Sequence, residues 1–332
     1  MKILLISNYK RGVGGINAQV DLLQQFINQE DEWQADIFST KGNPLRRVVA
    51  FFKLLSKARK YNVLHIHACS YWGMVPAVFG VLAGKLWRKR TIITYHGGEA
   101  KDYFAKHAAF VRRWLGRADE VIVLSGFLKE IFDQYQIPCV VIPNIVVLRP
   151  QTERTTTIAP KFISIRHLEP LYNIPCVLQA YEQVLKQYPE ASLDILGQGS
   201  MRAELEAYVQ EHHLTGVTFV GQVPNDTIYD YFANASIMLS APKIDNMPVS
   251  LLEAMNAGLL VISSRVGGVP YMIEDGKTGL LFECDNSEDM AAKMQWALVH
   301  PQEVNTMIIA AQKEVQKYSW ENVKPQLMKI YE

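Results

Sequence analysis

Residues 245–258, DNMPVSLLEAMNAG, decide how the fold of this chain is interpreted. They follow Ile237–Ser240, a short apolar run that is typical of a buried strand. Pro248 suits the first position of a helix, and Gly258 suits the position just past its end. The stretch therefore predicts a strand, a loop and a helix, with unpaired N–H groups and positive dipole charge at the helix start.

Two carboxylates flank the predicted helix start. Asp245 lies just before it, and Glu253 lies one to two turns inside the helix. A helix start of this kind is a site for a diphosphate, and the carboxylates could accept hydrogen bonds from sugar hydroxyls. The structural alternative is that Asp245 only caps the helix and that Glu253 lies on the surface.

Short apolar runs alternate with amphipathic stretches such as Ile16–Gln29 along the whole chain. This alternation predicts right-handed crossovers and parallel sheets, whose strands are buried on both faces. The predicted strands are Lys2–Ser7, Gln34–Ser39, Val63–His67, Thr91–Tyr95, Glu120–Leu124, Cys139–Ile142, Phe162–Ile165, Ser192–Leu196, Thr218–Val220, Ile237–Ser240, Leu260–Ser263 and Gly279–Phe282.

The chain length of 332 residues corresponds to about two domains. Residues 148–160 contain two Pro and a Thr triplet without apolar periodicity, so we predict a linker there. We expect an α/β protein with two doubly wound, Rossmann-like domains, 1–147 and 161–316, which face an interdomain cleft. The last residues, 317–332, are predicted to form a helix that packs back on the first domain.

Charge is distributed unevenly between the halves of the chain. Residues 1–150 contain 21 Lys/Arg and 11 Asp/Glu, and residues 151–332 contain 13 and 22. A basic first half favours an anionic partner. The four Cys form no CxxC pair, which argues against a disulfide framework or a zinc ribbon and favours a reducing cytosol.

Three glycine-containing turns follow predicted strands. They are Gly12–Gly15, His96–Gly98 and Gly197–Gly199. Each could bring backbone close to a ligand, but each is equally compatible with an ordinary turn, and His96 with a structural histidine. His65 and His67 share one face of a strand, yet no carboxylate or Cys completes a metal site there.

The motifs together resemble the family 4, group 1 glycosyltransferases, which are retaining enzymes of the GT-B fold. The resemblance covers nearly the whole chain, and its most specific element is Asp245-x7-Glu253 followed by Ala254, Met255 and Gly258. The other matching elements are Gly14-Gly15, His96-Gly97, Ser125, Ile142-Pro143-Asn144, Gly197-x-Gly199, Phe219-x-Gly221, Val266–Pro270 and Gly276-x-x-Gly279.

The resemblance implies a UDP-, GDP- or ADP-sugar donor bound by residues 161–316, an acceptor bound by residues 1–147, and no metal or other cofactor. It implies catalytic roles for His96, Asp245 and Glu253, with Glu253 on the ribose, Asp245 on the donor sugar and His96 approaching that sugar. The donor contacts that it implies are Gly15, Arg166, His167, Tyr172, Gly197, Gly199, Met247, Pro248, Val249, Ser250 and Glu253.

Two departures from the family pattern concern the donor site. His167 stands where the family has Arg, and Tyr172 where it has the Lys that pairs with the diphosphate. Either Arg166 or another cation, such as Lys243 or Arg265, replaces them, or activity is low or absent. Asp245 also replaces the usual Glu, and Asn173 replaces a usual Gly.

The expected acceptor-binding domain, residues 1–147, carries clusters of basic residues. A predicted amphipathic helix, Arg46–Tyr61, has an apolar face that runs from Val48 to Ala58. The basic residues Lys53, Lys57, Lys60, Arg88 and Arg90 could dock the domain on an anionic membrane. The alternative is that the apolar face packs on the sheet and the lysines are solvated. Nucleic acid is not an expected partner.

We therefore expect a retaining, metal-independent glycosyltransferase of the hexosyltransferase type. It would act in bacterial polysaccharide or glycolipid biosynthesis, on a saccharide or lipid-linked acceptor. We expect it in the cytoplasm, peripheral on the inner face of the membrane. The alternatives are a non-catalytic relative that binds a sugar nucleotide or serves as a scaffold, and a sugar-nucleotide epimerase of the same fold.

Overall fold

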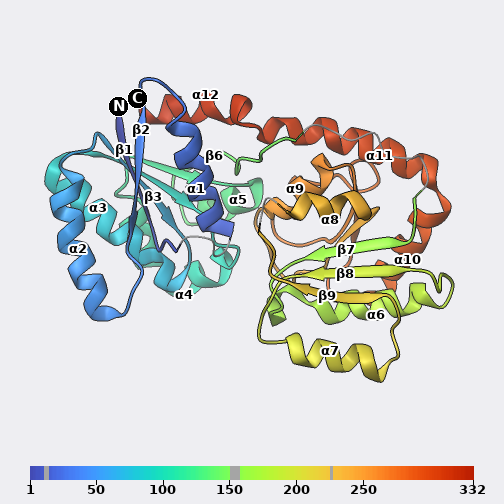
Figure 1. Cartoon of the computed structure of the whole chain (residues 1–332). Coiled ribbons are helices and arrows are strands. Elements are labelled where there is room, and N and C mark those ends of the chain that lie inside the picture. The colour runs from blue at the N-terminus through green and yellow to red at the C-terminus, as the bar shows by residue number, and fades with distance from the viewer. Residues whose placement is uncertain (11–14, 150–157, 225–226) are drawn as a thin grey trace. The chain divides into compact units, whose positions relative to one another are not determined.

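The computed structural model describes residues 1–10, 15–149, 158–224 and 227–332 (Figure 1). Residues 12–14 of the first glycine motif and 150–157 of the predicted linker lie outside the described residues. The chain forms two units. The first contains Met1–Ile145 and Tyr318–Glu332, and the second contains Val146–Lys317.

The first unit is built on a six-stranded parallel sheet with the order β2-β1-β3-β4-β5-β6. Its strands are β1 Lys2–Ser7, β2 Gln34–Ser39, β3 Val63–Ala68, β4 Arg90–Tyr95, β5 Glu120–Val123 and β6 Val140–Val141. Its helices are α1 Gly15–Ile27, α2 Pro44–Ala58, α3 Val75–Trp87, α4 Ala100–Leu115, α5 Gly126–Gln134 and α12 Trp320–Tyr331, with a 3-10 turn η1 at Tyr71–Met74.

Helices cover both faces of this sheet. One core cluster joins the strands to α1 and α12, and the other joins them to α2, α3, α4 and α5. The C-terminal helix α12 is held by a stack of Trp320 on Phe26, with ring centroids 5.2 Å apart, and by a hydrogen bond from the Trp320 indole to Glu30. The last helix of the chain is therefore a structural part of the first unit.

The second unit has a six-stranded parallel sheet with the order β12-β11-β10-β7-β8-β9. Its strands are β7 Lys161–Ile165, β8 Ser192–Leu196, β9 Val217–Gly221, β10 Ile237–Ser240, β11 Leu260–Ser264 and β12 Leu280–Phe282. Its helices are α6 Ile174–Leu185, α7 Arg202–Glu211, α8 Ile228–Asn234, α9 Val249–Asn256, α10 Ser287–Val299 and α11 Pro301–Glu314, and its 3-10 turns include η2 Pro170–Tyr172.

The predicted fold class, two doubly wound α/β sheets, is confirmed. The strands β1, β2, β8 and β10 have the predicted bounds. The strand that is shortest relative to its prediction is β6, which contains Val140–Val141 instead of Cys139–Ile142. It is an edge strand between Pro138 and Pro143, and proline cannot donate a hydrogen bond to the sheet. Helix α9 begins at Val249, one residue later than predicted, because Pro248 is its N-cap and not its first helical residue.

Candidate functional site

The candidate donor site lies at the carboxyl edge of the second sheet, where the loops after β7, β8, β10 and β11 meet. In a doubly wound sheet this edge is where ligands bind. Arg166 follows β7, Gly197 follows β8, Asp245 follows β10 and Gly267 follows β11. These residues are far apart in the sequence, and the parallel topology brings them together.

Arg166 and Asp245 form a nearly buried ion pair in this group. Nη1 of Arg166 lies 3.1 Å from Oδ2 of Asp245, and the two side chains are 9% and 18% exposed. Nε and Nη2 of Arg166 also donate to Oγ of Ser240, and the guanidinium lies 5.6 Å from the centre of the Tyr172 ring. Burial raises the pKa of Asp245, whereas the Arg166 charge and the Asn246 N–H lower it.

Two glycines allow these loops to approach closely. Gly197 has φ +142°, and a Cβ there would lie 1.9 Å from the carbonyl oxygen of Arg166. Gly267 has φ +50°, and a Cβ there would lie 2.0 Å from the carbonyl oxygen of Asp245, which accepts a hydrogen bond from the Gly268 N–H. Backbone packing of this kind fixes the positions of Arg166 and Asp245.

The start of α9 faces the same loop. Pro248 and Met247 are buried, and the first N–H groups of a helix have no partner within it. The Oγ atom of Ser250 is buried and has no hydrogen-bond partner among the described residues. The N-cap residue of α9 is Pro248 and not Asp245, so the capping alternative is wrong.

Glu253 lies inside α9 and is partly buried, so the surface alternative is also wrong. Burial raises the pKa of Glu253 to about 7, and the charge of Arg149 works in the opposite direction. The Arg149 guanidinium lies 4.1 Å from the centre of the Tyr229 ring, and the Glu253 charge adds to the burial that raises the pKa of Tyr229 to about 12. The motifs did not point to Arg149 or Tyr229, because neither belongs to a recognisable sequence pattern.

The structure selects among the candidate cations. His167 is exposed, Lys243 pairs with Asp285, and Arg265 pairs with Asp275 and Glu283. Arg166 is thus the predicted replacement that lies beside Asp245. Asn173 has φ +51°, which explains why glycine suits this position and why Asn can replace it.

The first unit places three histidines together, with His65 and His67 in β3 and His96 directly after β4. Nδ1 of His67 lies 2.9 Å from Nε2 of His96, and the His65 and His67 rings stack at 4.6 Å. Both ring nitrogens of His65 are hydrogen-bonded, Nδ1 to the hydroxyl of Tyr331 at 2.6 Å and Nε2 to the hydroxyl of Thr94 at 2.7 Å. Burial lowers the pKa of His96 to about 4, so its imidazole is neutral at pH 7.

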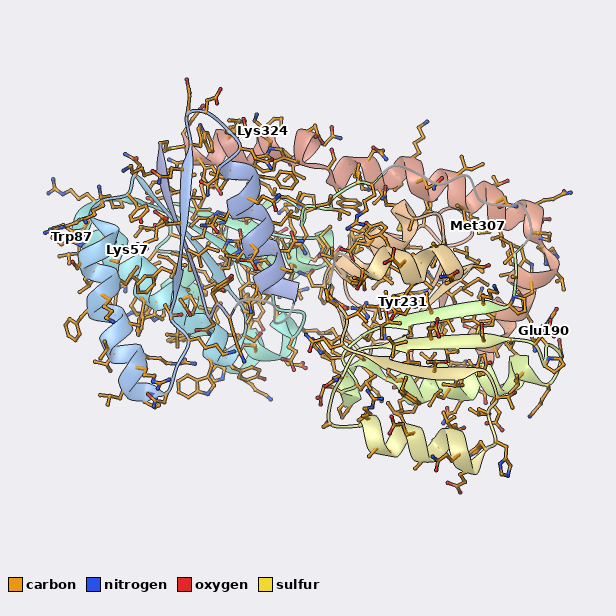
Figure 2. All side chains as sticks on the ribbon, in the orientation of Figure 1. Lys57, Trp87, Glu190, Tyr231, Met307 and Lys324 are labelled. Carbon is orange, nitrogen blue, oxygen red and sulfur yellow. The ribbon has the colours of Figure 1, made fainter. Side chains whose placement is uncertain are left out.

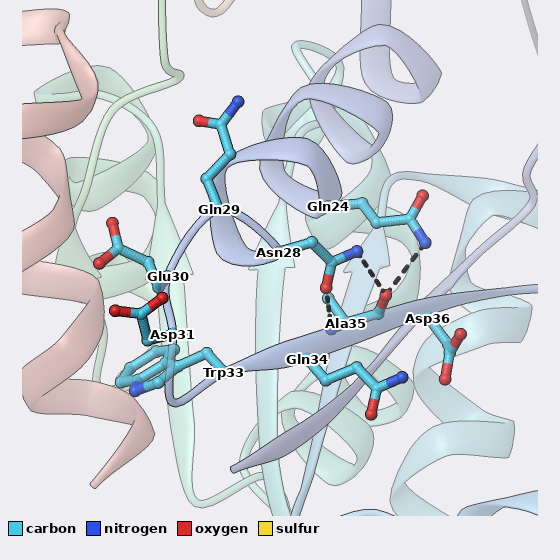
Figure 3. A pocket seen from close by; sticks show the side chains of 9 residues that line it. All are labelled: Gln24, Asn28, Gln29, Glu30, Asp31, Trp33, Gln34, Ala35 and Asp36. Carbon is cyan, nitrogen blue, oxygen red and sulfur yellow. Dashed lines mark hydrogen bonds between the residues drawn. The ribbon is translucent and has the colours of Figure 1, made fainter.

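Cavities and metal ligands add little to this picture. A cavity of about 30 Å³, room for a water molecule or two, lies against the three histidines. A more open hollow of about 570 Å³ lies between the end of α1 and the start of β2, where Gln24 and Asn28 bond to Ala35 (Figure 3). It lies at the amino end of β2, away from the carboxyl edge of the sheet. Among the described residues, no three His, Cys, Asp or Glu side chains gather as metal ligands.

The predicted basic surface is only partly assembled. Lys53, Lys60 and Arg88 are exposed, and Lys57 is partly exposed. Arg90 instead donates from Nε to the carbonyl of Ile330 at 2.7 Å and is partly buried. In the ranges that the structure describes, no helix is both long enough and apolar enough to cross a bilayer.

Gly15 is the first residue of α1, where it is exposed, and a Cβ there would meet nothing within 4 Å. Gly199 packs against the Leu168 carbonyl, 2.2 Å from an added Cβ. Val249 begins α9 and is partly exposed. The predicted donor residues of the second unit thus gather around one sheet edge, whereas Gly15 and His96 belong to the first unit.

Comparison with known proteins identifies the family. A sulfoquinovosyl transferase of Arabidopsis thaliana is 31% identical over 43% of this chain and 28% of its own length. A phosphatidyl-myo-inositol mannosyltransferase of Mycolicibacterium smegmatis is 29% identical over 50% of this chain and 43% of its own length. The chain thus matches less than half the length of these two relatives.

The fold is shared with a solved structure. The crystal structure of Anabaena Alr3699/HepE in complex with UDP superposes with a TM-score of 0.81 at 17% identity, over 99% of both chains. A model described as glycosyl transferases group 1 matches residues 151–314, and a model of glycosyltransferase family 4 matches residues 29–149. The two models cover most of both units, and the chain therefore belongs to the family 4, group 1 glycosyltransferases.

Proposed function

We propose that this glycosyltransferase is a retaining, metal-independent enzyme of the hexosyltransferase type. It would move a sugar from a nucleoside-diphosphate sugar to a saccharide or lipid-linked acceptor. The observation that carries the proposal is the pairing of Arg166 with Asp245 beside the start of α9. This arrangement combines a cation and free N–H groups for a diphosphate with a carboxylate for sugar hydroxyls.

The donor would be held by groups at this edge. Glu253 would accept hydrogen bonds from the ribose hydroxyls, and Asp245 would hold hydroxyls of the transferred sugar. The backbone of Met247–Ser250, with the N–H groups of Val249 and Ser250, and the unpartnered Oγ of Ser250 would meet sugar and phosphate oxygens. Crystal structures of HepE hold UDP and UDP-glucose, which supports testing a UDP-sugar first.

In the proposed reaction the bond from the anomeric carbon to the diphosphate oxygen breaks, and the diphosphate leaves with the electron pair. The acceptor oxygen bonds to the anomeric carbon on the same face, and its proton passes to the leaving phosphate oxygen. Arg166 and the α9 N–H groups would stabilise the charge that develops on the diphosphate. His96 would hydrogen-bond the sugar as a neutral imidazole, because a base with a pKa near 4 is not protonated at pH 7.

We propose a role in bacterial polysaccharide or glycolipid biosynthesis, in the cytoplasm at the inner face of the membrane. The name of the mycobacterial relative includes a phosphatidylinositol acceptor, which supports a lipid-linked acceptor here. The basic surface of the first unit supports an anionic membrane as a partner.

Calorimetry with purified protein and a panel of UDP-, GDP- and ADP-sugars tests the proposal. Binding of one donor is expected, and NMR of the product should show the anomeric configuration of the donor, with activity unchanged in EDTA. Failure to bind any sugar nucleotide contradicts the proposal. Donor binding without transfer would favour the non-catalytic alternative, and isomerisation of the sugar without an acceptor would favour the epimerase.

A further inference from the structure

An exposed apolar stripe runs along α2 in the first unit. Its members are Leu45, Val48, Val49 and Phe52, spaced i, i+3, i+4 and i+7, and all four are exposed. Leu45 is 74% exposed and Phe52 is 64% exposed. The alternative that the apolar face from Val48 to Ala58 packs on the sheet is therefore wrong for Val48 and Phe52, although Ala58 is buried together with Leu54. A scattered apolar side chain needs no explanation, but four on one helix face form a patch.

The neighbouring helix α3 also carries exposed apolar side chains. Trp87 donates from its indole N–H to the carbonyl of Leu55 at 2.7 Å, so the C-terminal halves of α2 and α3 are in contact. Figure 2 labels Lys57 and Trp87 on these two helices. The exposed apolar side chains of α3 are Leu82, Leu86 and Trp87.

The charged side chains of the segment that carries the stripe are all basic. From residue 37 to residue 98 the chain contains eleven Lys/Arg and no Asp or Glu. Arg46 and Lys53 are exposed beside the stripe, and Lys85 and Arg88 are exposed at the end of α3. A helix with an exposed apolar face and basic flanks is the pattern that lies in the interface of an anionic bilayer.

The stripe begins at the carboxyl edge of the sheet, the edge that carries His96. Helix α2 starts shortly after β2 ends, and the Arg47 guanidinium lies 4.8 Å from the centre of the Trp72 ring. Trp72 follows β3 and is 69% exposed. Tryptophan is favoured where an apolar surface meets water at a membrane.

We infer that the surface formed by the exposed apolar and basic side chains of α2 and α3, with Trp72, docks on an anionic lipid bilayer. The acceptor is then lipid-anchored, because a bilayer at this surface lies beside the edge that holds His96. The choice of acceptor rests on the proposed function, whereas the docking itself does not. A second copy of the chain fits the surface less well, because a two-fold contact would bring Lys53 and Arg46 against like charges.

Sedimentation of the full-length protein with vesicles tests the inference. The protein should sediment with phosphatidylcholine–phosphatidylglycerol vesicles, less at high salt, and not with phosphatidylcholine alone. The double variant Leu45→Ser/Phe52→Ser should reduce vesicle binding about tenfold, since it removes two exposed apolar side chains. The matched control is Ile309→Ser on α11, because Ile309 is 67% exposed in the second unit and should leave binding unchanged.

The inference is overturned if the unmodified protein does not sediment with anionic vesicles. It is also overturned if the double variant binds these vesicles as well as the unmodified protein does. A dimer in solution that the double variant converts to a monomer would also overturn it, in favour of a second copy. Donor binding by calorimetry is measured on the same proteins and should not change. Vesicle binding without donor binding would therefore contradict the proposed function and leave the docking inference standing.

Discussion

Arg166 and Asp245 contact each other across two loops of the second unit, with 3.1 Å between Nη1 and Oδ2. Arg166 comes from the loop after β7 and Asp245 from the loop after β10, so the pair ties neighbouring strands together at their carboxyl ends. The guanidinium also receives support from Ser240 and the Tyr172 ring. A cation held so firmly neutralises the nearly buried carboxylate of Asp245, and under the proposed function it would be preorganised for a diphosphate.

Replacing Arg166 should therefore damage both stability and donor binding. In Arg166→Met the Asp245 carboxylate stays buried without its partner, so we expect a loss of about 3 kcal/mol in the free energy of unfolding. Under the proposed function, UDP affinity should fall by more than about tenfold, because the cation proposed to pair with the diphosphate is lost. Urea unfolding and calorimetry measure the two effects.

The double variant Arg166→Met/Asp245→Leu separates the two effects. It removes both charges, so it should recover most of the lost stability while donor binding stays weak. Full donor affinity in either variant would show that the pair has only a structural role.

Glu253 should make stability depend on pH. Its pKa is about 7 in the folded protein, against 4.5 for an ordinary Glu, so between these values the folded state holds a proton that the unfolded chain has released. Stability contributed by this group is therefore present at low pH and lost as the pH rises toward 7. As the pH rises from 5 to 8, the free energy of unfolding should fall by about 2 kcal/mol more in the unmodified protein than in Glu253→Gln. Urea unfolding measures this difference. Equal losses in both proteins would contradict the raised pKa.

The buried histidines should make stability depend on pH in the opposite direction to Glu253. Burial lowers the pKa of His65 to about 3, so this imidazole stays neutral in the folded protein while the unfolded chain takes up a proton near pH 6.5. Its stability contribution is complete above pH 6.5 and is lost as the pH falls. At pH 5 the loss should be about 2 kcal/mol.

Comparison with His65→Gln isolates the contribution of the His65 imidazole to the pH dependence of stability. An amide side chain can still bond to the hydroxyls of Tyr331 and Thr94 but does not take up a proton. The variant should lose less stability than the unmodified protein between pH 8 and pH 5. The control is His107→Gln in the same unit, where the side chain is exposed. If His107→Gln changes the pH dependence as much as His65→Gln, the effect does not come from burial.

The sequence predicted the sheets and the residues around α9 because these features are local. Alternation of apolar runs identifies strands, and Pro248 and Gly258 bracket α9 within one residue. The ion pairs of Lys243 and Arg265 were not predictable, because they depend on which loops meet in space. For the same reason the motif alignment left three cations open, whereas the structure puts Arg166 beside Asp245.

Long-range packing also explains what the sequence analysis missed in the first unit. Helical periodicity shows that α2 has an apolar face, but not which face the sheet covers. The structure buries Leu54 and leaves Phe52 exposed. The contact between His65 and Tyr331 joins residues 266 positions apart, which no local pattern encodes.

Gly267 and Gly276 provide a matched test of how the donor site is built. Both have positive φ, +50° and +75°, so an Ala at either position adopts a left-handed conformation at a cost of about 1 kcal/mol. Only at Gly267 would the new Cβ meet backbone, 2.0 Å from the carbonyl oxygen of Asp245, whereas Gly276 has nothing within 4 Å. Gly267→Ala must therefore displace Asp245 and weaken the hydrogen bond from the Gly268 N–H.

Gly267→Ala should lose UDP-sugar affinity by about tenfold and destabilise the protein by at least 2 kcal/mol. Gly276→Ala should keep its donor affinity, and its free energy of unfolding should fall only by the strain of the left-handed residue. Calorimetry and urea unfolding of the two variants side by side measure the difference. Because the backbone strain is common to both, any difference in donor affinity comes from the displaced Asp245. Equal donor affinity in the two variants would mean that the position of Asp245 does not matter for binding the sugar.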